Sequence, residues 1–233
     1  MRHLLTAGVL ALSFGTRELD GQNSALTPFG AAKAESILRH QLPCLGCHTL
    51  QNEGGRIGPD LTSVRERRST AYIAAMIADP QRVVPGSAMP RMPMPEATRD
   101  LIVRFLDELP ATAPAPDAAA PTPAAPAAAA TDGSALYARW CASCHGAGGK
   151  GDGPNASFLP VKPAQHASRQ AMEVRSDDAL YDTIHGGGAI MNRSARMPAF
   201  GATLTDPEIR ALIAHIRSLC NCRGPEWSRD GTR

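Results

Sequence analysis

The chain has 233 residues, which suits one or two domains, and its formal net charge is only +2. So small a charge argues against nucleic acid as a partner. The one dense basic run, from Arg65 to Arg68, contains Glu66 and is more typical of a solvated face than of a docking patch. Aromatic residues make up only 4% of the sequence, so small domains built from it bury limited area unless another apolar group fills their cores.

The first fifteen residues have the pattern of a secretory signal peptide. A basic start at Arg2 precedes an apolar stretch from Leu4 to Leu12. A stretch of ~9–12 residues is too short to span a bilayer comfortably. We expect residues 1–15 to direct export to the periplasm, and the alternative is an uncleaved amphipathic anchor. The rest of the sequence has no apolar run that predicts an integral membrane span.

Residues 30–109 form a first predicted module. A short helix over residues 31–40 leads into Cys44-Leu45-Gly46-Cys47-His48. On a helical turn, positions i, i+3 and i+4 share one face, so both thiols and the imidazole point the same way. A Cys-x-x-Cys-His motif is typical of covalent c-type haem attachment, with the thiols on the vinyl groups and the His on the iron. The module closes with an amphipathic helix whose apolar positions lie on one face: Leu101, Ile102, Phe105, Leu106 and Leu109.

Residues 110–132 consist mostly of proline and alanine. Prolines spaced this closely favour extended polyproline II, and fully extended the segment spans roughly 70 Å. It therefore predicts a semi-rigid linker between two separable modules.

Residues 133–222 form the second predicted module and repeat the first. A short helix over residues 134–140 leads into Cys141-Ala142-Ser143-Cys144-His145. Thr205 and Glu208 form a capping-box pattern, with Pro207 in the first turn of the closing helix. The apolar face of that helix contains Ile209, Leu212, Ile213, Ile216 and Leu219. No convincing alternating strand appears in either module, and residues 223–233 form a short tail.

Each Cys-x-x-Cys pair has two other interpretations. A zinc site needs a second ligand pair at a fixed offset, and the chain has no Cys-x-x-Cys without a following His. A thioredoxin-like redox pair needs a βαβ pattern around it, and none is found. The repetition of the motif therefore favours two covalently bound c-type haems, held by Cys44, Cys47, His48, Cys141, Cys144 and His145.

A methionine before each closing helix is the expected sixth iron ligand, opposite His48 or His145. In the second module we expect Met197, which Pro198 stiffens, and the competing residues are Met191 and His185. In the first module, superposing the two closing helices places the counterpart of Met197 near position 86. Met89 is the nearest methionine and is favoured over Met92. A thioether ligand raises the potential of the iron and is typical of electron carriers.

Two cysteines remain near the end of the second module. Cys220 and Cys222 either pair with each other in a local disulfide or stay as structural thiols, and a metal or intermolecular role is the third alternative. We expect His40, His166 and His185 to be ordinary loop or surface residues.

The order of these elements resembles class I cytochrome c, twice over and across most of residues 30–222. The resemblance implies a mostly α fold of two small helical domains, each wrapped around a covalent haem c, with the first and last helices crossing. It also implies that a proline carbonyl after each motif orients the proximal His. Pro59 matches this role by position, and Pro154 is the counterpart although it lies two residues closer to its His. The first module departs from the family in having no Gly directly after His48.

The favoured interpretation is a periplasmic dihaem carrier of single electrons between redox proteins, not an enzyme. One alternative is the cytochrome subunit of a dehydrogenase or oxidase complex, peripherally associated with a membrane. A haem peroxidase is disfavoured, because it needs an open iron and both modules offer methionines.

Overall fold

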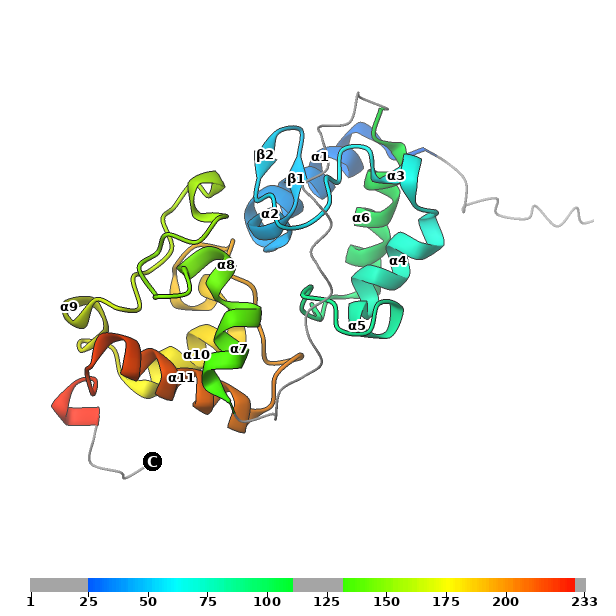
Figure 1. Ribbon diagram of the computed structural model, residues 1–233. Helices are drawn as coiled ribbons and strands as arrows, with labels where there is room; N and C mark the ends of the chain where they lie inside the picture. The colour runs from blue at the N-terminus through cyan, green and yellow to red at the C-terminus, as the bar shows by residue number, and fades with distance from the viewer. Residues whose placement is uncertain (1–24, 111–131, 229–233) are drawn as a thin grey trace, which may run out of the picture.

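The computed structural model describes residues 25–110 and 132–228 (Figure 1). The expected signal peptide and residues 111–131 of the expected linker lie outside the described residues. The described parts are mostly α-helical and contain two separate hydrophobic clusters, one in residues 25–110 and one in residues 132–228. We call these two parts the first and second modules. No helix within the described residues is both long and apolar enough to cross a membrane.

The first module is built from short helices and one hairpin. Its elements are α1 (Pro28–Ser36), the π-helical turn η1 (Ile37–Gln41), α2 (Cys44–Cys47), β1 (Thr49–Leu50), β2 (Glu53–Gly54), α3 (Val64–Arg67), α4 (Thr70–Ala78), α5 (Pro80–Val83) and α6 (Glu96–Glu108). The opening helix starts where Thr27 Oγ1 accepts a hydrogen bond from the Gly30 N–H at 3.1 Å, with Pro28 in the first turn.

The core of the first module lies between α6 and the helices α1 and α4 that pack on it (Figure 1). The predicted apolar face of the closing helix is confirmed: Ile102, Phe105, Leu106 and Leu109 are buried, and Leu101 is half-buried against the same cluster. The hairpin, in which Thr49 pairs with Gly54, was not predicted from the sequence, because two-residue strands are too short to show alternation.

The second module has helices at both ends and irregular loops between them. Its elements are α7 (Gly133–Trp140), α8 (Ala142–His145), η2 (Ala156–Phe158), α9 (Arg169–Met172), α10 (Asp177–Gly186), η3 (Gly188–Met191), α11 (Asp206–Cys220) and η4 (Glu226–Ser228). The predicted capping box is present, since the Glu208 carboxylate accepts a hydrogen bond from the Thr205 N–H at 2.7 Å.

Helices α7 and α11 make the most extensive contact of the second module. Tyr137 of α7 is buried, as are Ile209, Leu212 and Ile216 of α11. Gly133 stands where the two backbones approach closely, because a Cβ there would lie well within 3.0 Å of the Ala211 carbonyl oxygen. The opening and closing helices of this module therefore pack against each other, as the resemblance to cytochrome c implies.

Candidate functional site

The first Cys-x-x-Cys-His motif forms a single helical turn. Cys44–Cys47 make up α2, and the His48 N–H donates to the Cys44 carbonyl at 2.9 Å. The Nδ1 atom of His48 lies 2.8 Å from the Pro59 carbonyl oxygen, which is the pairing implied by the resemblance. A carbonyl only accepts, so Nδ1 carries the proton and Nε2 keeps its lone pair for a metal.

The second motif has the same arrangement, but the carbonyl that orients its histidine does not belong to Pro154, the expected residue. His145 Nδ1 donates to the Ala164 carbonyl oxygen at 2.9 Å, not to Pro154. The segment around Pro154 makes a different contact, because the Asn155 N–H donates to the Ser143 carbonyl at 2.9 Å and holds this segment against the motif turn. The loop must therefore run on to Ala164, which follows Pro163, before a carbonyl reaches the imidazole.

Burial lowers the pKa of both motif histidines and raises the pKa of Cys44, Cys47 and Cys141. Desolvation lowers the pKa of His48 and that of His145, although the hydrogen bonds to the Pro59 and Ala164 carbonyls oppose the shift. Desolvation raises the pKa of the thiols, to about 11 for Cys44 and about 12 for Cys47 and Cys141. A neutral imidazole is the form that binds iron.

His166 lies in a loop, as expected from the sequence, but it is not a surface residue. It is buried, its ring stacks on that of His145 with centroids 4.1 Å apart, and its Nδ1 shares a 3.0 Å hydrogen bond with the Tyr137 hydroxyl. Burial lowers the pKa of His166 to about 2, so this ring stays neutral. The expectation for His40 and His185 is confirmed, since both are exposed.

The methionines expected as sixth ligands lie in loops just before the closing helices. Met197 is half-buried against the second cluster, where its carbonyl accepts from the Gly188 N–H at 3.1 Å. Met89 and Met92 are both half-buried, so burial does not choose between them. Met94 packs against the first hydrophobic cluster, as a core residue does. The choice of ligand in each module stays a prediction.

The residues present fit a covalently bound haem at each motif. Each turn offers two thiols and one imidazole Nε2 on a single face, and the carbonyl partner holds the ring in one tautomer. Within the described residues, Arg139 Nε and Arg196 Nη1 are buried without a hydrogen-bond partner. Buried donors of this kind require an acceptor, and the carboxylates of a haem have the right chemistry.

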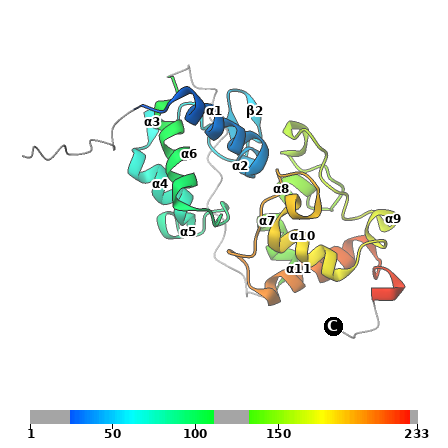
Figure 2. The ribbon, with the colours of Figure 1, turned by 180° about the vertical axis from the view of Figure 1, so that it is seen from behind.

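The two motif turns lie next to each other, where the modules meet; both views place α2 and α8 at this boundary (Figures 1 and 2). The Asn155 Nδ2 atom donates to the Gly46 carbonyl at 2.6 Å and lies 3.4 Å from the Cys144 sulfur. The two modules are therefore in direct contact, whereas the linker composition predicts separable units. Nothing in the sequence around Asn155 signals this role, because it depends on a segment 109 positions away.

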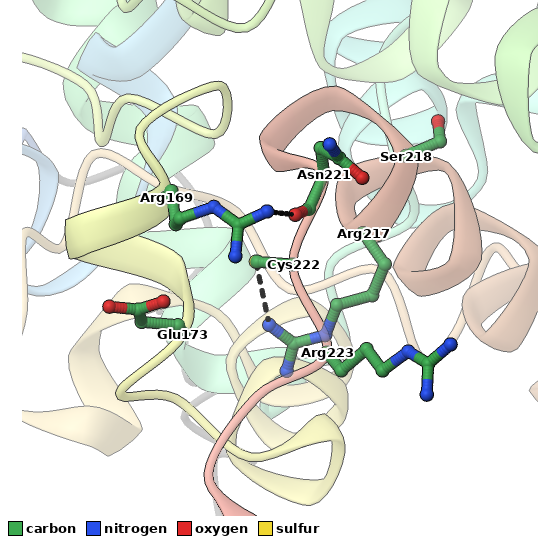
Figure 3. A pocket seen from close by; sticks show the side chains of 7 residues that line it. All are labelled: Arg169, Glu173, Arg217, Ser218, Asn221, Cys222 and Arg223. Carbon is green, nitrogen blue, oxygen red and sulfur yellow. Dashed lines mark hydrogen bonds between the residues drawn. The ribbon is translucent and has the colours of Figure 1, made fainter.

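The two remaining cysteines are joined in the structure, which settles one alternative left open by the sequence. Cys220 and Cys222 form a disulfide at the end of α11. Beside it is a pocket of about 490 Å³ lined by Arg169, Glu173, Arg217, Ser218, Asn221, Cys222 and Arg223. Figure 3 shows that Arg169 donates to the backbone oxygen of Asn221. Arg217 Nε donates to the Asp177 carboxylate at 2.8 Å. Arg169 and Arg217, which line the pocket, therefore stabilise the fold of the second module through contacts within the chain.

Comparison with known proteins supports the cytochrome assignment for one module. Residues 128–216 match the family model described as cytochrome c oxidase, cbb3-type, subunit III. The match supports a c-type cytochrome. No curated protein matches the chain. Among solved structures, the reducing HAO-like protein complex of Kuenenia stuttgartiensis is 24% identical over 75% of this chain and 79% of that chain, with a TM-score of 0.33, a value at which the likeness carries no argument.

Proposed function

We propose that the protein is an exported c-type cytochrome with two covalently bound haems, which passes single electrons between redox proteins in the periplasm. The observation that carries this proposal is the recurrence of one arrangement. In both motifs a Cys-x-x-Cys-His turn presents its thiols, and a backbone carbonyl holds Nδ1 of the His, so that Nε2 is free to bind iron. The family match to residues 128–216 supports the same assignment for the second module.

When bound, haem supplies one-electron redox chemistry at its iron. The chain holds each haem, orients the histidine that binds its iron, and adjusts the potential of that iron. Cys44, Cys47, Cys141 and Cys144 tether the two groups. The Pro59 and Ala164 carbonyls fix the rings of the proximal histidines and raise the basicity of Nε2. Met197, and Met89 in the first module, complete the coordination, and a thioether in this position favours the reduced iron and raises its potential.

A second proposal is that this carrier works as the electron-transfer subunit of a larger oxidoreductase. It is favoured by the family model that matches the second module, which describes a subunit of an oxidase. The bond chemistry would then belong to a partner subunit. Purification under mild conditions separates the two proposals, because a subunit co-purifies with a redox enzyme in fixed ratio whereas a free carrier does not.

The test of the main proposal is expression of the full chain together with a haem-attachment system. We expect two haems per chain that survive acid–acetone extraction, two reversible one-electron waves, and a sulfur-to-iron charge-transfer band from each module. Met89→Ala should remove the band of the first haem and Met92→Ala should spare it. A chain without covalent haem would refute the proposal, and rapid cyanide binding by the resting protein would instead favour a peroxidase.

A further inference from the structure

We infer that the second module is part of the first haem site: it holds both the attachment turn and the Met89 loop of the first module, and so sets methionine ligation at the first iron. By the Met89 loop we mean residues 87–92. The inference rests on the proposed function and adds to it a positioning role for residues of the other module.

The first contact fixes the attachment turn through Asn155. This side chain is only 1% exposed, although it is polar and belongs to a loop. Its Nδ2 donates to the Gly46 carbonyl at 2.6 Å, inside the first motif, and its Oδ1 accepts from the Arg56 N–H at 2.8 Å. Both hydrogen bonds of this buried amide join the second module to the first, so they favour one arrangement of the two modules.

The two modules are also closely packed around the same turn. A Cβ at Gly46 would lie well within 3.0 Å of the Arg196 carbonyl oxygen. The Arg196 side chain, 9% exposed, pairs with Glu53 of β2 at 2.8 Å, and the Arg56 guanidinium lies 4.5 Å from the Phe158 ring centroid. Gly46 occupies one of the two variable positions of the motif, so the interface requires a residue there that haem attachment does not.

The second contact ties the Met89 loop to the second module at Arg91 and, more weakly, at Ser87. The Arg91 N–H donates to Thr203 Oγ1 of the second module at 2.8 Å. On the other side of Met89, the Ser87 carbonyl accepts from Gln81 Nε2 of the first module at 2.5 Å, and Arg139 Nη2 of α7 approaches the same carbonyl at 3.5 Å. Ser87 Oγ accepts from the Met89 N–H at 3.1 Å. The loop therefore takes part of its hydrogen bonding from the second module.

A methionine sulfur is a weak, uncharged ligand, so its hold on the iron depends on how well the loop is placed in advance. The Met89 loop has no regular secondary structure of its own. Removing a contact from the second module should let the loop move away more often and leave the first iron open for a larger fraction of the time. An added ligand then binds more tightly in proportion to that open fraction.

Two variants of the full chain test the inference, each with a matched control. Thr203→Val keeps the volume but removes the acceptor for the Arg91 N–H, whereas Thr183→Val removes a hydroxyl that donates to the Ala179 carbonyl within α10. Gly46→Ala forces the interface apart, whereas Gly148→Ala adds a methyl group where no atom lies within 4 Å.

Three quantities are measured: the haem content, the binding of added imidazole to the oxidised protein, and the reduction potential of each haem. Each redox wave is assigned to its haem by comparison with Met89→Ala and Met197→Ala. We expect Thr203→Val to tighten imidazole binding at the first haem by about fivefold, the ratio that corresponds to one hydrogen bond. Gly46→Ala should tighten imidazole binding at the first haem by a larger factor. The potential of the first haem should fall in both variants and stay unchanged in both controls, and the potential of the second haem should stay unchanged in Thr203→Val.

Two covalent haems with an unmoved first wave and unchanged imidazole binding in Thr203→Val would overturn the inference and leave the proposed function intact. Absence of covalent haem from the parent protein would instead overturn the proposed function itself. If Gly46→Ala does not accumulate, Thr203→Val decides alone, since it changes no packing volume.

Discussion

Gly133→Ala should destabilise the second module, although the same change in most helices is favourable. In an exposed helix interior, alanine is better than glycine by up to about 1 kcal/mol. Here the added methyl group would lie well within 3.0 Å of the Ala211 carbonyl oxygen, a separation that real Cβ atoms essentially never show. Because that oxygen belongs to the backbone of α11, it moves only if the two helices separate. Overpacking of this kind costs about 1–3 kcal/mol. Because Gly133 is the first residue of α7 and not an interior one, we subtract no gain in helix propensity and expect a net loss of roughly 1–3 kcal/mol.

The matched control is Gly30→Ala in α1, the opening helix of the first module. Its nearest contacts would be Thr27 Oγ1 at 3.3 Å and Leu26 Cδ2 at 3.4 Å, and both atoms belong to side chains. We expect the unfolding free energy of the first module to change by no more than about 0.5 kcal/mol.

The measurement is thermal unfolding of the full-length protein, followed by the sulfur-to-iron band of each module in turn. For a domain of this size, each 1 kcal/mol lowers Tm by about 4–8 °C. A second module that is as stable in the Gly133→Ala variant as in the parent would refute the close helix crossing inferred from the backbone.

Three further predictions concern the sites. Cys44→Ser should cost one haem per chain and leave the second in place, whereas Cys220→Ser should keep both. The number of haems per chain is counted after acid–acetone extraction, and loss of both haems from Cys44→Ser would contradict the two-site proposal. Met197→Ala should open the second iron, so that the reduced protein binds carbon monoxide at one haem, and a variant as unreactive as the parent would move the ligand elsewhere. Desolvation acts to raise the pKa of Asp79, but hydrogen bonds and charge from Arg91 outweigh it and hold that pKa below its usual 3.8. The stability that Asp79 contributes is therefore present above pH 3.8 and is lost as pH falls through its lowered folded-state pKa. Acid titration of the first charge-transfer band should show this step in the parent and a smaller one in Asp79→Asn.

Local patterns in the sequence were enough to predict the features that depend on neighbours along the chain. The motif turns follow from helical spacing, since positions i, i+3 and i+4 share a face. The same spacing correctly predicted which side of each closing helix is buried, as with Leu106 and Leu212. The start of α11 at Thr205 was readable because a capping box satisfies N–H groups within four residues. Pro59 was placed correctly through the resemblance to cytochrome c.

Only the tertiary structure decided how distant segments meet. The carbonyl that orients His145 comes from Ala164 and not from Pro154, because backbone bonds to the motif turn hold the nearer proline away. The burial of His166, a loop residue, depends on Tyr137 reaching it from α7. The contact between Asn155 and Gly46 joins residues 109 positions apart across the two modules. A linker of proline and alanine permits such an approach but does not specify it, because docking is determined by the fit of two finished surfaces and not by any local pattern.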